Sequence, residues 1–346
     1  MTSPDLAILL TPPGSAAIAV IRLLGPAMPR FLRDHFSRPL SPGRPIHGNL
    51  TDASTILDDP IVVLSPDNRF ADISLHGGLW VVRTVLDLAA RSGFHVLDNL
   101  RAPLPPEALD ADDPLQQEVL SYLPLARTDL ALRSLLAQPA AWKNLLQTTP
   151  DPQRLQAILA DRSLHWLLHP PRVAIIGAPN VGKSTLANQL FAQQRVITAD
   201  IPGTTRDWVG ELANLDGLAV MLVDTPGLRS TDDPIEQQAV AHASAEIQRA
   251  DLVLLVLDPT QPLSAQSPHF TSHPGARVVV NKCDLPPLWD TSTISAIHAS
   301  ALTSQGIDPL RSAIRAHFAC ESLDPTTARC WTDRQRHTLQ HALASP

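Results

Sequence analysis

The stretch that decides the fold is GAPNVGKST, which runs from Gly177 to Thr185. It follows the apolar run RVAII and precedes STLANQLF, so it lies between an expected strand and an expected helix. Its spacing, G-x-x-x-x-G-K-[ST], is the pattern of a phosphate-binding loop. Glycines let the backbone approach phosphate, and successive amide N–H groups at the helix N-terminus face the anion. The stretch therefore predicts a nucleotide site in an α/β P-loop domain.

Side chains of this loop have expected roles in the same chemistry. We expect Lys183 to reach the β- and γ-phosphates and Ser184 to coordinate Mg²⁺. Asn180 offers a carbonyl oxygen suited to K⁺, and a cation there would neutralise charge that develops between the two phosphates. The remaining expected nucleotide contacts of the loop are Val181, Gly182 and Thr185. Taken alone, the loop leaves ATP and GTP equally open.

A second motif, DTPG at 224–227, directly follows the apolar run LAVMLV. We expect Asp224 to hold Mg²⁺ through its water shell and Gly227 to offer its N–H to the γ-phosphate. The segment after it then becomes a nucleotide-sensitive switch. Upstream, GTTRD supplies the hydroxyls of Thr204 and Thr205, which we expect to meet Mg²⁺ in the triphosphate state.

The motif NKCD at 281–284 selects the base. Asp284 is expected to accept hydrogen bonds from guanine N1–H and the 2-amino group, which adenine lacks; such pairing discriminates by roughly 10⁴ or more. We expect Asn281 to meet the base edge and brace the phosphate loop, and Lys282 to lay its alkyl stem along the purine. Ser300 and Ala301, in HASALTSQG, place a loop under guanine O6. The motifs together predict GTP and GDP as ligands.

Two interpretations are open for the residue that orients the attacking water. A Ras-type GTPase has glutamine directly after the switch glycine, but this chain has Leu228, which cannot hydrogen-bond. Glu236, twelve residues after Asp224, begins a helix-like run and is a candidate to position the water. It is equally explained as a favourable charge in a first helical turn. The residues alone leave both interpretations open.

Composition limits the other possibilities. The 346 residues are enough for two or three domains. A net charge of −7 gives no general sign of a nucleic-acid partner, and the three cysteines show no metal or disulfide spacing, which favours a reducing compartment. The N-terminus lacks a basic region, and the longest apolar runs are too short to span a bilayer. We therefore expect a cytoplasmic protein without a membrane partner.

Patterning divides the chain into four parts. Residues 1–105 alternate β-like runs with one helical stretch near 78–91, which predicts an α+β domain. Residues 115–170 have helical spacing. Residues 172–320 alternate strands and helices, with apolar runs typical of a mixed, mostly parallel sheet. A further helical tail over 321–346 suggests that the G domain is inserted into a reduced helical domain.

These segments resemble the family of the tRNA modification GTPase MnmE (TrmE). The resemblance is carried by GAPNVGKSTLANQLF, ITADIPGTTRDWVGEL, the DTPG segment and NKCD. The phrase PGTTRD alone is shared with relatives such as Era and Der. LLTPPGSAAIAVIRLLGP, ADISLHGGLWVVRTVLDLAARSGF and the tail ARCWTDRQRHTLQHAL resemble MnmE in particular. The resemblance implies an N-terminal domain that dimerises and binds a tetrahydrofolate derivative. It also implies K⁺-stimulated hydrolysis as G domains meet, with Asn180 as the K⁺ ligand and Glu236 as the catalytic residue. The implied reaction modifies the wobble uridine of tRNA together with the flavoprotein MnmG.

The printed sequence departs from the family pattern at several points. It ends HALASP without the C-x-G-K motif, is about a hundred residues shorter, and has DTPG in place of DTAG. HVLDNLRAPLPPEALD stands where the family has G-E-F-T and N-G-K segments. The missing C-terminal motif and the replaced segment lie outside the G domain, whose nucleotide motifs are all present. Two alternatives therefore remain open: a diverged GTPase switch or binding module that has lost the modification chemistry, and a ribosome-assembly-type GTPase.

Overall fold

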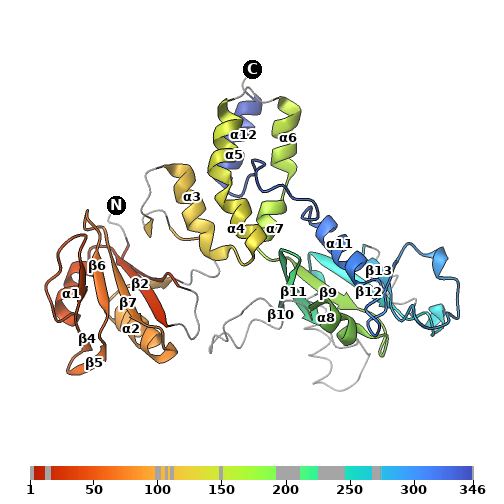
Figure 1. Cartoon of the computed structure of the whole chain (residues 1–346), viewed down its shortest axis with the longest axis horizontal. Coiled ribbons are helices and arrows are strands. Elements are labelled where there is room, and N and C mark those ends of the chain that lie inside the picture. Colours follow the sequence, from red (N-terminus) through yellow and green to blue (C-terminus); the bar gives the residue numbers. More distant parts are fainter. Residues whose placement is uncertain are drawn as a thin grey trace. The chain divides into compact units, whose positions relative to one another are not determined.

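The computed structural model forms two compact units, one ending at Leu125 and the other beginning at Ala126. Figure 1 colours the chain from its N-terminus to its C-terminus. The residues that the structure describes are 4–11, 17–97, 103–105, 108–109, 113–147, 151–191, 211–224, 245, 247–266, 273 and 275–344.

The first unit is built on a six-stranded sheet in the order β3-β6-β7-β2-β1-β8. Its strand pairs are antiparallel except β1 with β8. The strands of this sheet are β1 (Leu6–Leu9), β2 (Ile18–Leu24), β3 (Pro45–His47), β6 (Ile61–Leu64), β7 (Phe70–His76) and β8 (His95–Leu97). A separate pair consists of β4 (Leu50–Asp52) and β5 (Thr55–Asp58), and the helices are α1 (Met28–His35), α2 (Leu79–Arg91) and α3 (Pro114–Tyr122), followed by the 3₁₀ turn η2 (Leu123–Leu125).

Alternating burial along β2 explains why this sheet has a core face. Ile21 and Leu23 are fully buried, and the two residues between and before them are more exposed. Ile73 of β7 lies opposite Ile21, and both belong to one core cluster with Phe31 of α1 and Leu88 of α2. The helical stretch predicted near 78–91 is confirmed by α2.

The second unit contains another six-stranded sheet, in the order β10-β11-β9-β12-β13-β14. Only the β10–β11 pair is antiparallel. Its elements are β9 (Arg172–Ile176), α8 (Lys183–Phe191), β10 (Glu211–Leu215), β11 (Leu218–Asp224), β12 (Leu252–Leu257), β13 (Arg277–Val280), η3 (Thr291–Thr293), β14 (Ile297–His298) and α11 (Ile307–His317). The continuous apolar runs are buried because helices or loops cover both faces. The predicted P-loop fold with a mixed, mostly parallel sheet is confirmed.

The hairpin of β10 and β11 shows how local sequence fixes the edge of this sheet. Leu215 lies opposite Leu218, with Asp216 and Gly217 between them at φ values of 48° and 103°. A two-residue turn with positive φ at both positions favours Asp-Gly, because glycine adopts this region without strain. The turn places an antiparallel strand beside β11, so β10 forms one edge of the sheet and the parallel strand β14 forms the other.

A helical block accompanies the G domain in the same unit. It consists of α4 (Asp129–Leu136), α5 (Gln138–Gln147), α6 (Pro152–Ala160), α7 (Ser163–Leu168) and α12 (Asp333–Ala344). Figure 1 shows α12, in blue, beside α5 and α6, and Arg336 donates from Nη1 to the Leu159 carbonyl at 3.1 Å. The last helix thus returns to a helix that lies before the G domain, and its contact with Leu159 spans 177 positions of sequence.

Arg329 fixes this return. Its buried guanidinium donates from Nε to Asp161 Oδ2 at 3.0 Å and to Ser163 Oγ at 2.8 Å. Its carbonyl accepts from Trp142 Nε1 at 2.9 Å, and its N–H donates to Gln138 Oε1 at 2.8 Å. One segment after the G domain therefore contacts three separate helical segments before it.

Candidate nucleotide site

The candidate site lies where three parallel strands of the second sheet end. Leu255 of β12 pairs with Ile176 of β9, and Leu257 of β12 pairs with Val280 of β13. The loops that follow these strands therefore leave the sheet at one edge. In open α/β sheets, ligands bind outside the carboxyl ends of the strands. The sheet brings GAPNVGKST and NKCD together across about a hundred residues of sequence.

Two glycines make the first of these loops possible. Gly177 has φ 149°, and a Cβ there would lie 2.4 Å from the Val256 carbonyl oxygen. Gly182 has φ 93°, and a Cβ there would lie 2.3 Å from Nδ2 of Asn281. Both distances are impossible for a real side chain, so the loop sequence is dictated by close packing as well as by backbone conformation.

Asn281 joins three loops at the edge of the sheet. Its side chain is 1% exposed; Nδ2 donates to the Val181 carbonyl at 2.9 Å and Oδ1 accepts from the Ala301 N–H at 3.0 Å. Its own N–H donates to the Leu257 carbonyl at 2.8 Å. The predicted phosphate loop and the two predicted base-recognition loops are therefore held in one arrangement by a single amide.

Lys183 and Ser184 begin α8, directly after the phosphate loop. The Lys183 ammonium is buried and donates to the carbonyls of Gly177 at 3.1 Å and Ala178 at 3.0 Å. The amide N–H groups of the first helical turn carry partial positive charge and favour an anion. A cationic side chain and a helix N-terminus thus occur at the same loop, which is the arrangement that phosphate recognition requires.

A partly buried ion pair connects the base motif to the phosphate loop. Lys282 donates from Nζ to Asp258 Oδ2 at 2.5 Å and to the Asn180 carbonyl at 2.9 Å. Asp258 follows β12 and is fully buried; Thr260 donates to its Oδ1 from both N–H and hydroxyl. Burial acts to raise the pKa of Asp258, but the hydrogen bonds from Lys282 and Thr260 outweigh it and the pKa is lowered.

Lys282 and Asn180 also share an unusual backbone conformation, with φ values of 58° and 64°. Residues other than glycine adopt this region at a cost of order 1–3 kcal/mol and do so mainly at functional sites. The contact between the two strained residues shows that each loop supports the conformation of the other.

The structure places the other predicted residues as follows. Ser300 is fully buried next to Ala301, its Oγ accepts from the Thr303 N–H at 3.1 Å, and Asp284 is exposed. Asp224 is the last residue of β11, opposite Ile175 of β9, which puts its backbone at the same edge of the sheet. Thr204, Thr205, Gly227 and Glu236, together with Leu228, lie outside the described residues.

Two residues with evident importance were not predicted. Asp258 had a sequence signal, because it ends the apolar run LVLLVL just as Asp224 ends LAVMLV. Arg311 had no sequence signal. It is 5% exposed and donates from Nη2 to the carbonyls of Gln189 and Leu190, at the C-terminal end of α8. This contact satisfies helix-end carbonyls, which no local motif announces.

Comparison with known proteins identifies the family. A family model described as a 50S ribosome-binding GTPase matches residues 172–282. The tRNA modification GTPase MnmE of Chloroflexus aurantiacus is 30% identical to this chain, over 96% of it and 85% of that protein. The chain belongs to the MnmE family of tRNA modification GTPases. The MnmE proteins of Nitratidesulfovibrio vulgaris, at 32% identity over 90% of this chain and 80% of theirs, and of Thermus thermophilus, at 30% over 89% and 81%, agree with this assignment.

Membership of the MnmE family confirms several predictions. The chain is a GTPase that binds GTP and GDP, and GTPases of this class use Mg²⁺.

Among solved structures, the FeoB G domain of Methanococcus jannaschii is 25% identical over 43% of this chain and 98% of that chain, with a TM-score of 0.33.

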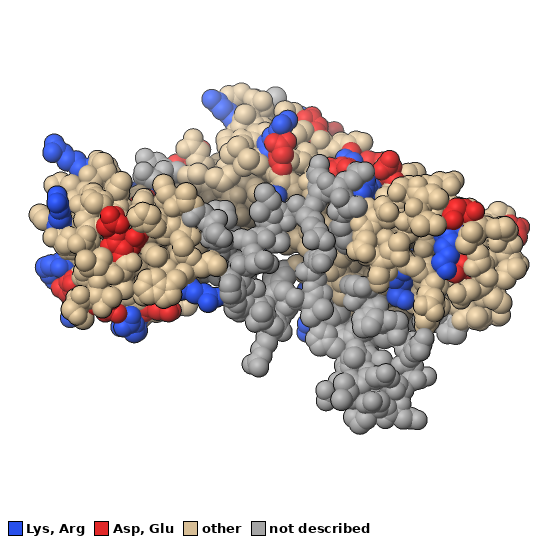
Figure 2. Space-filling view, turned by 60° about the horizontal axis from the view of Figure 1, so that its bottom comes forward, with Lys and Arg blue, Asp and Glu red and all other residues tan. Residues whose placement is uncertain are grey.

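Two surface properties complete the description. In the part of the chain that the structure describes, no helix has the length and apolar character needed to cross a bilayer. Figure 2 shows basic and acidic side chains interspersed over the described surface of the face it presents, rather than gathered by sign.

Proposed function

We propose that this MnmE-family chain acts in the modification of tRNA wobble uridines, with the GTP site as the part that drives the process. The observation that carries the proposal is the extent of the similarity. The match to the Chloroflexus relative covers 96% of this chain, so it includes the first unit and the helical block as well as the G domain. Fold and GTPase activity alone would leave the substrate open.

The site residues are proposed to divide the nucleotide between them. The phosphate loop, Asn180 to Thr185, holds the phosphates, with Lys183 at the β- and γ-phosphates. Asp284 and Asn281 recognise guanine, and Lys282 lies along the base. Ser300 and Ala301 lie below O6. Ser184, Thr205 and Asp224 are the proposed Mg²⁺ ligands. Thr204 is proposed to offer its hydroxyl to the same ion in the triphosphate state, and Gly227 its N–H to the γ-phosphate. Hydroxyl and carboxylate oxygens suit Mg²⁺, which prefers hard oxygen donors, and Ser184 and Asp224 leave the same edge of the sheet.

For hydrolysis we propose K⁺ bound at Asn180 and water positioned by Glu236. The Asn180 backbone carbonyl already accepts from Lys282, so its side-chain oxygen is the proposed K⁺ ligand. A cation there stabilises charge developing on the phosphates. Glu236 orients the attacking water, which Leu228 cannot do because its side chain forms no hydrogen bonds.

Turnover measured in K⁺ and in Na⁺, over a range of protein concentrations, tests this mechanism. We expect faster turnover in K⁺ and a rate per molecule that rises with concentration as G domains pair. Glu236→Ala should keep GTP affinity and lose roughly 10²-fold or more of turnover. Equal rates in the two salts would remove Asn180 from its role.

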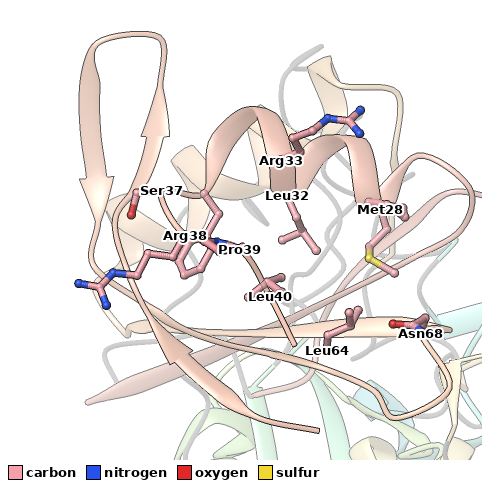
Figure 3. Close-up of a pocket in the computed structure, with 11 residues that line it drawn as sticks. Met28, Leu32, Arg33, Ser37, Arg38, Pro39, Leu40, Leu64 and Asn68 are labelled. Carbon is pink, nitrogen blue, oxygen red and sulfur yellow. The ribbon is translucent and has the colours of Figure 1, made fainter. Parts of the chain in front are cut away.

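The first unit is proposed to dimerise, and a tetrahydrofolate derivative is proposed as its ligand. The unit has a cavity of about 490 Å³ beside α1, large enough for a small molecule. Figure 3 shows its apolar lining from Met28, Leu32, Leu40 and Leu64; Arg33 and Arg38 also line it, and their guanidinium groups extend away from it. Because neither guanidinium points into the cavity toward the place of a folate carboxylate, we do not assign folate to this cavity.

The proposed organisation is a domain over 1–105, a helical domain in two parts, 115–170 and 321–346, and a G domain over 172–320. The contacts of Arg329 with Asp161 and Ser163 support the joining of the two helical parts. MnmG and tRNA are the proposed macromolecular partners, and the cytoplasm is the proposed location.

A second candidate function is a GTPase switch that has lost the modification chemistry. It is favoured by the segment 95–110, which replaces the family's G-E-F-T and N-G-K pattern. Cys320 is no substitute for a reactive cysteine: burial, followed by the nearby charge of Asp161, raises the pKa of its thiol to about 12.

Expression of the chain in cells that lack MnmE, followed by nucleoside analysis of their tRNA, distinguishes the two candidates. Return of the modified wobble uridine supports the enzyme role. Absence of the modified uridine, in cells where the chain is folded and hydrolyses GTP, would leave the switch as the function. Lys183→Ala provides the matched control without nucleotide binding.

A further inference from the structure

A cluster of two histidines and two aspartates belongs to the first unit, whereas the phosphate loop and NKCD belong to the second. His47 ends β3, Asp58 ends β5 and is followed by Asp59, and His76 ends β7. The strand register explains why they meet. His47 lies opposite Ile61 of β6, and Ile61 lies opposite Ser74 of β7. Continuing the second pairing by two residues brings Asp59 level with His76.

The side chains of the cluster contact one another directly. His76 Nδ1 lies 2.7 Å from Asp58 Oδ1 and 3.6 Å from Asp59 Oδ1, and His47 Nε2 lies 3.3 Å from Asp59 Oδ2. One ligand-type atom from each of Asp58, Asp59 and His76 lies within 4.8 Å of the other two. An ion with bonds of about 2.0–2.2 Å separates its ligand atoms by roughly 3–4 Å. Small rotations of these three side chains are therefore enough to place them around a metal ion, and His47 lies next to the three through its contact with Asp59.

One member of the cluster is held in place before any ligand arrives. The Asp58 side chain is only 6% exposed, and its Oδ2 accepts from the His76 backbone N–H at 2.8 Å. Its other oxygen is left facing His76. The remaining three side chains are between 52% and 71% exposed, so an ion can reach them from solvent. A fixed carboxylate beside adjustable ligands lowers the ordering cost of binding.

The charges also favour a cation. Within the described ranges, the ion pairs of Asp58 and Asp59 are with histidines, not with lysine or arginine. When the two imidazoles are neutral, two carboxylates remain without a permanent positive partner. A divalent ion would balance them.

We propose that His47, Asp58, Asp59 and His76 form a binding site for a divalent transition metal ion of the zinc type. Imidazole nitrogen together with carboxylate oxygen suits Zn²⁺, Co²⁺ or Ni²⁺, whereas Mg²⁺ and Ca²⁺ prefer oxygen ligands alone. Binding ties the ends of β3, β5 and β7 together, so it stabilises this end of the first unit. The site is independent of GTP and of the wobble-uridine proposal.

Zinc titration of the full chain tests the proposal, after treatment with EDTA and removal of the chelator. Saturating Mg²⁺ and GDP occupy the G domain during the titration, and a chromophoric chelator reports free zinc. We expect one equivalent bound at micromolar zinc, and an unfolding midpoint that rises with zinc concentration. The double variant His47→Gln, His76→Gln should lose affinity at least about tenfold. His95→Gln, an exposed histidine in the same unit, should bind like the wild type.

His76→Gln alone disturbs the partner of a buried aspartate, so its fold is checked by circular dichroism in EDTA. His47→Gln removes only an exposed contact to Asp59 and should still weaken binding. The proposal is overturned if the wild type shows no saturable zinc binding, or if the double variant binds zinc with the same affinity as the wild type. Either result would mean that the four residues form ordinary histidine–aspartate ion pairs and no metal site.

Discussion

Replacing Asn281 with alanine tests the arrangement of the nucleotide site most sharply. The substitution removes the donor to the Val181 carbonyl and the acceptor of the Ala301 N–H, at 2.9 and 3.0 Å. Each buried group left unpaired costs about 1–3 kcal/mol. The lower bound of the sum is about 2 kcal/mol of the free energy that holds the loops in place, and the same free energy taken from nucleotide binding to restore the loops corresponds to about 30-fold in a binding constant. Because neither bond involves the γ-phosphate, we expect GTP and GDP affinities to fall alike.

The assay is equilibrium binding of fluorescent GDP and GTP analogues, with the unfolding midpoint measured in parallel. Asn214→Ala is the matched control: Asn214 Oδ1 accepts from the Gly217 N–H at 2.7 Å in the β10–β11 turn. We expect that variant to lose some stability and to keep its nucleotide affinity. An Asn281→Ala protein whose affinities stay within about threefold of the wild type refutes the reasoning.

Three further predictions concern ionisable side chains. Asp258→Asn weakens the hold on Lys282, and we expect GDP to dissociate about tenfold faster, measured by nucleotide chase; an unchanged rate argues against this link. Arg329→Met leaves Asp161 without its partner and should lower the free energy of unfolding by about 3 kcal/mol in urea, with nucleotide affinity retained. Burial, then repulsion from His169, lowers the pKa of His165 from 6.5 to about 4. Stability from this residue is complete above pH about 6.5 and declines as pH falls toward 4. His165→Phe should reduce this acid sensitivity in thermal melts, and identical pH profiles contradict it.

Much of the G domain could be predicted because its signals are local. Apolar runs bounded by GAPNVGKST, DTPG and NKCD gave strands that end where the motifs begin. The requirement for glycine at Gly177 and Gly182 follows from the same motif, and the structure adds the close contacts that enforce it.

The rest depends on contacts between residues far apart in sequence. The bond of Asn281 to Val181 spans 100 positions, and that of Arg329 to Asp161 spans 168. No spacing rule finds such pairs. The cluster at His76 likewise depends on the register of three strands, whereas its sequence shows only an isolated HGG turn. Glu236 stays a prediction, because it lies outside the described residues.

The most direct test of the account is the affinity of the purified chain for GTP, GDP, ATP and XTP with magnesium present, in the wild type and in Asp284→Asn. The account predicts saturable binding of GTP and GDP, no measurable binding of ATP, and a shift of the variant toward XTP because its amide donates where the carboxylate accepts. A wild type that fails to bind guanine nucleotides, or a variant with unchanged preference for GTP, contradicts it.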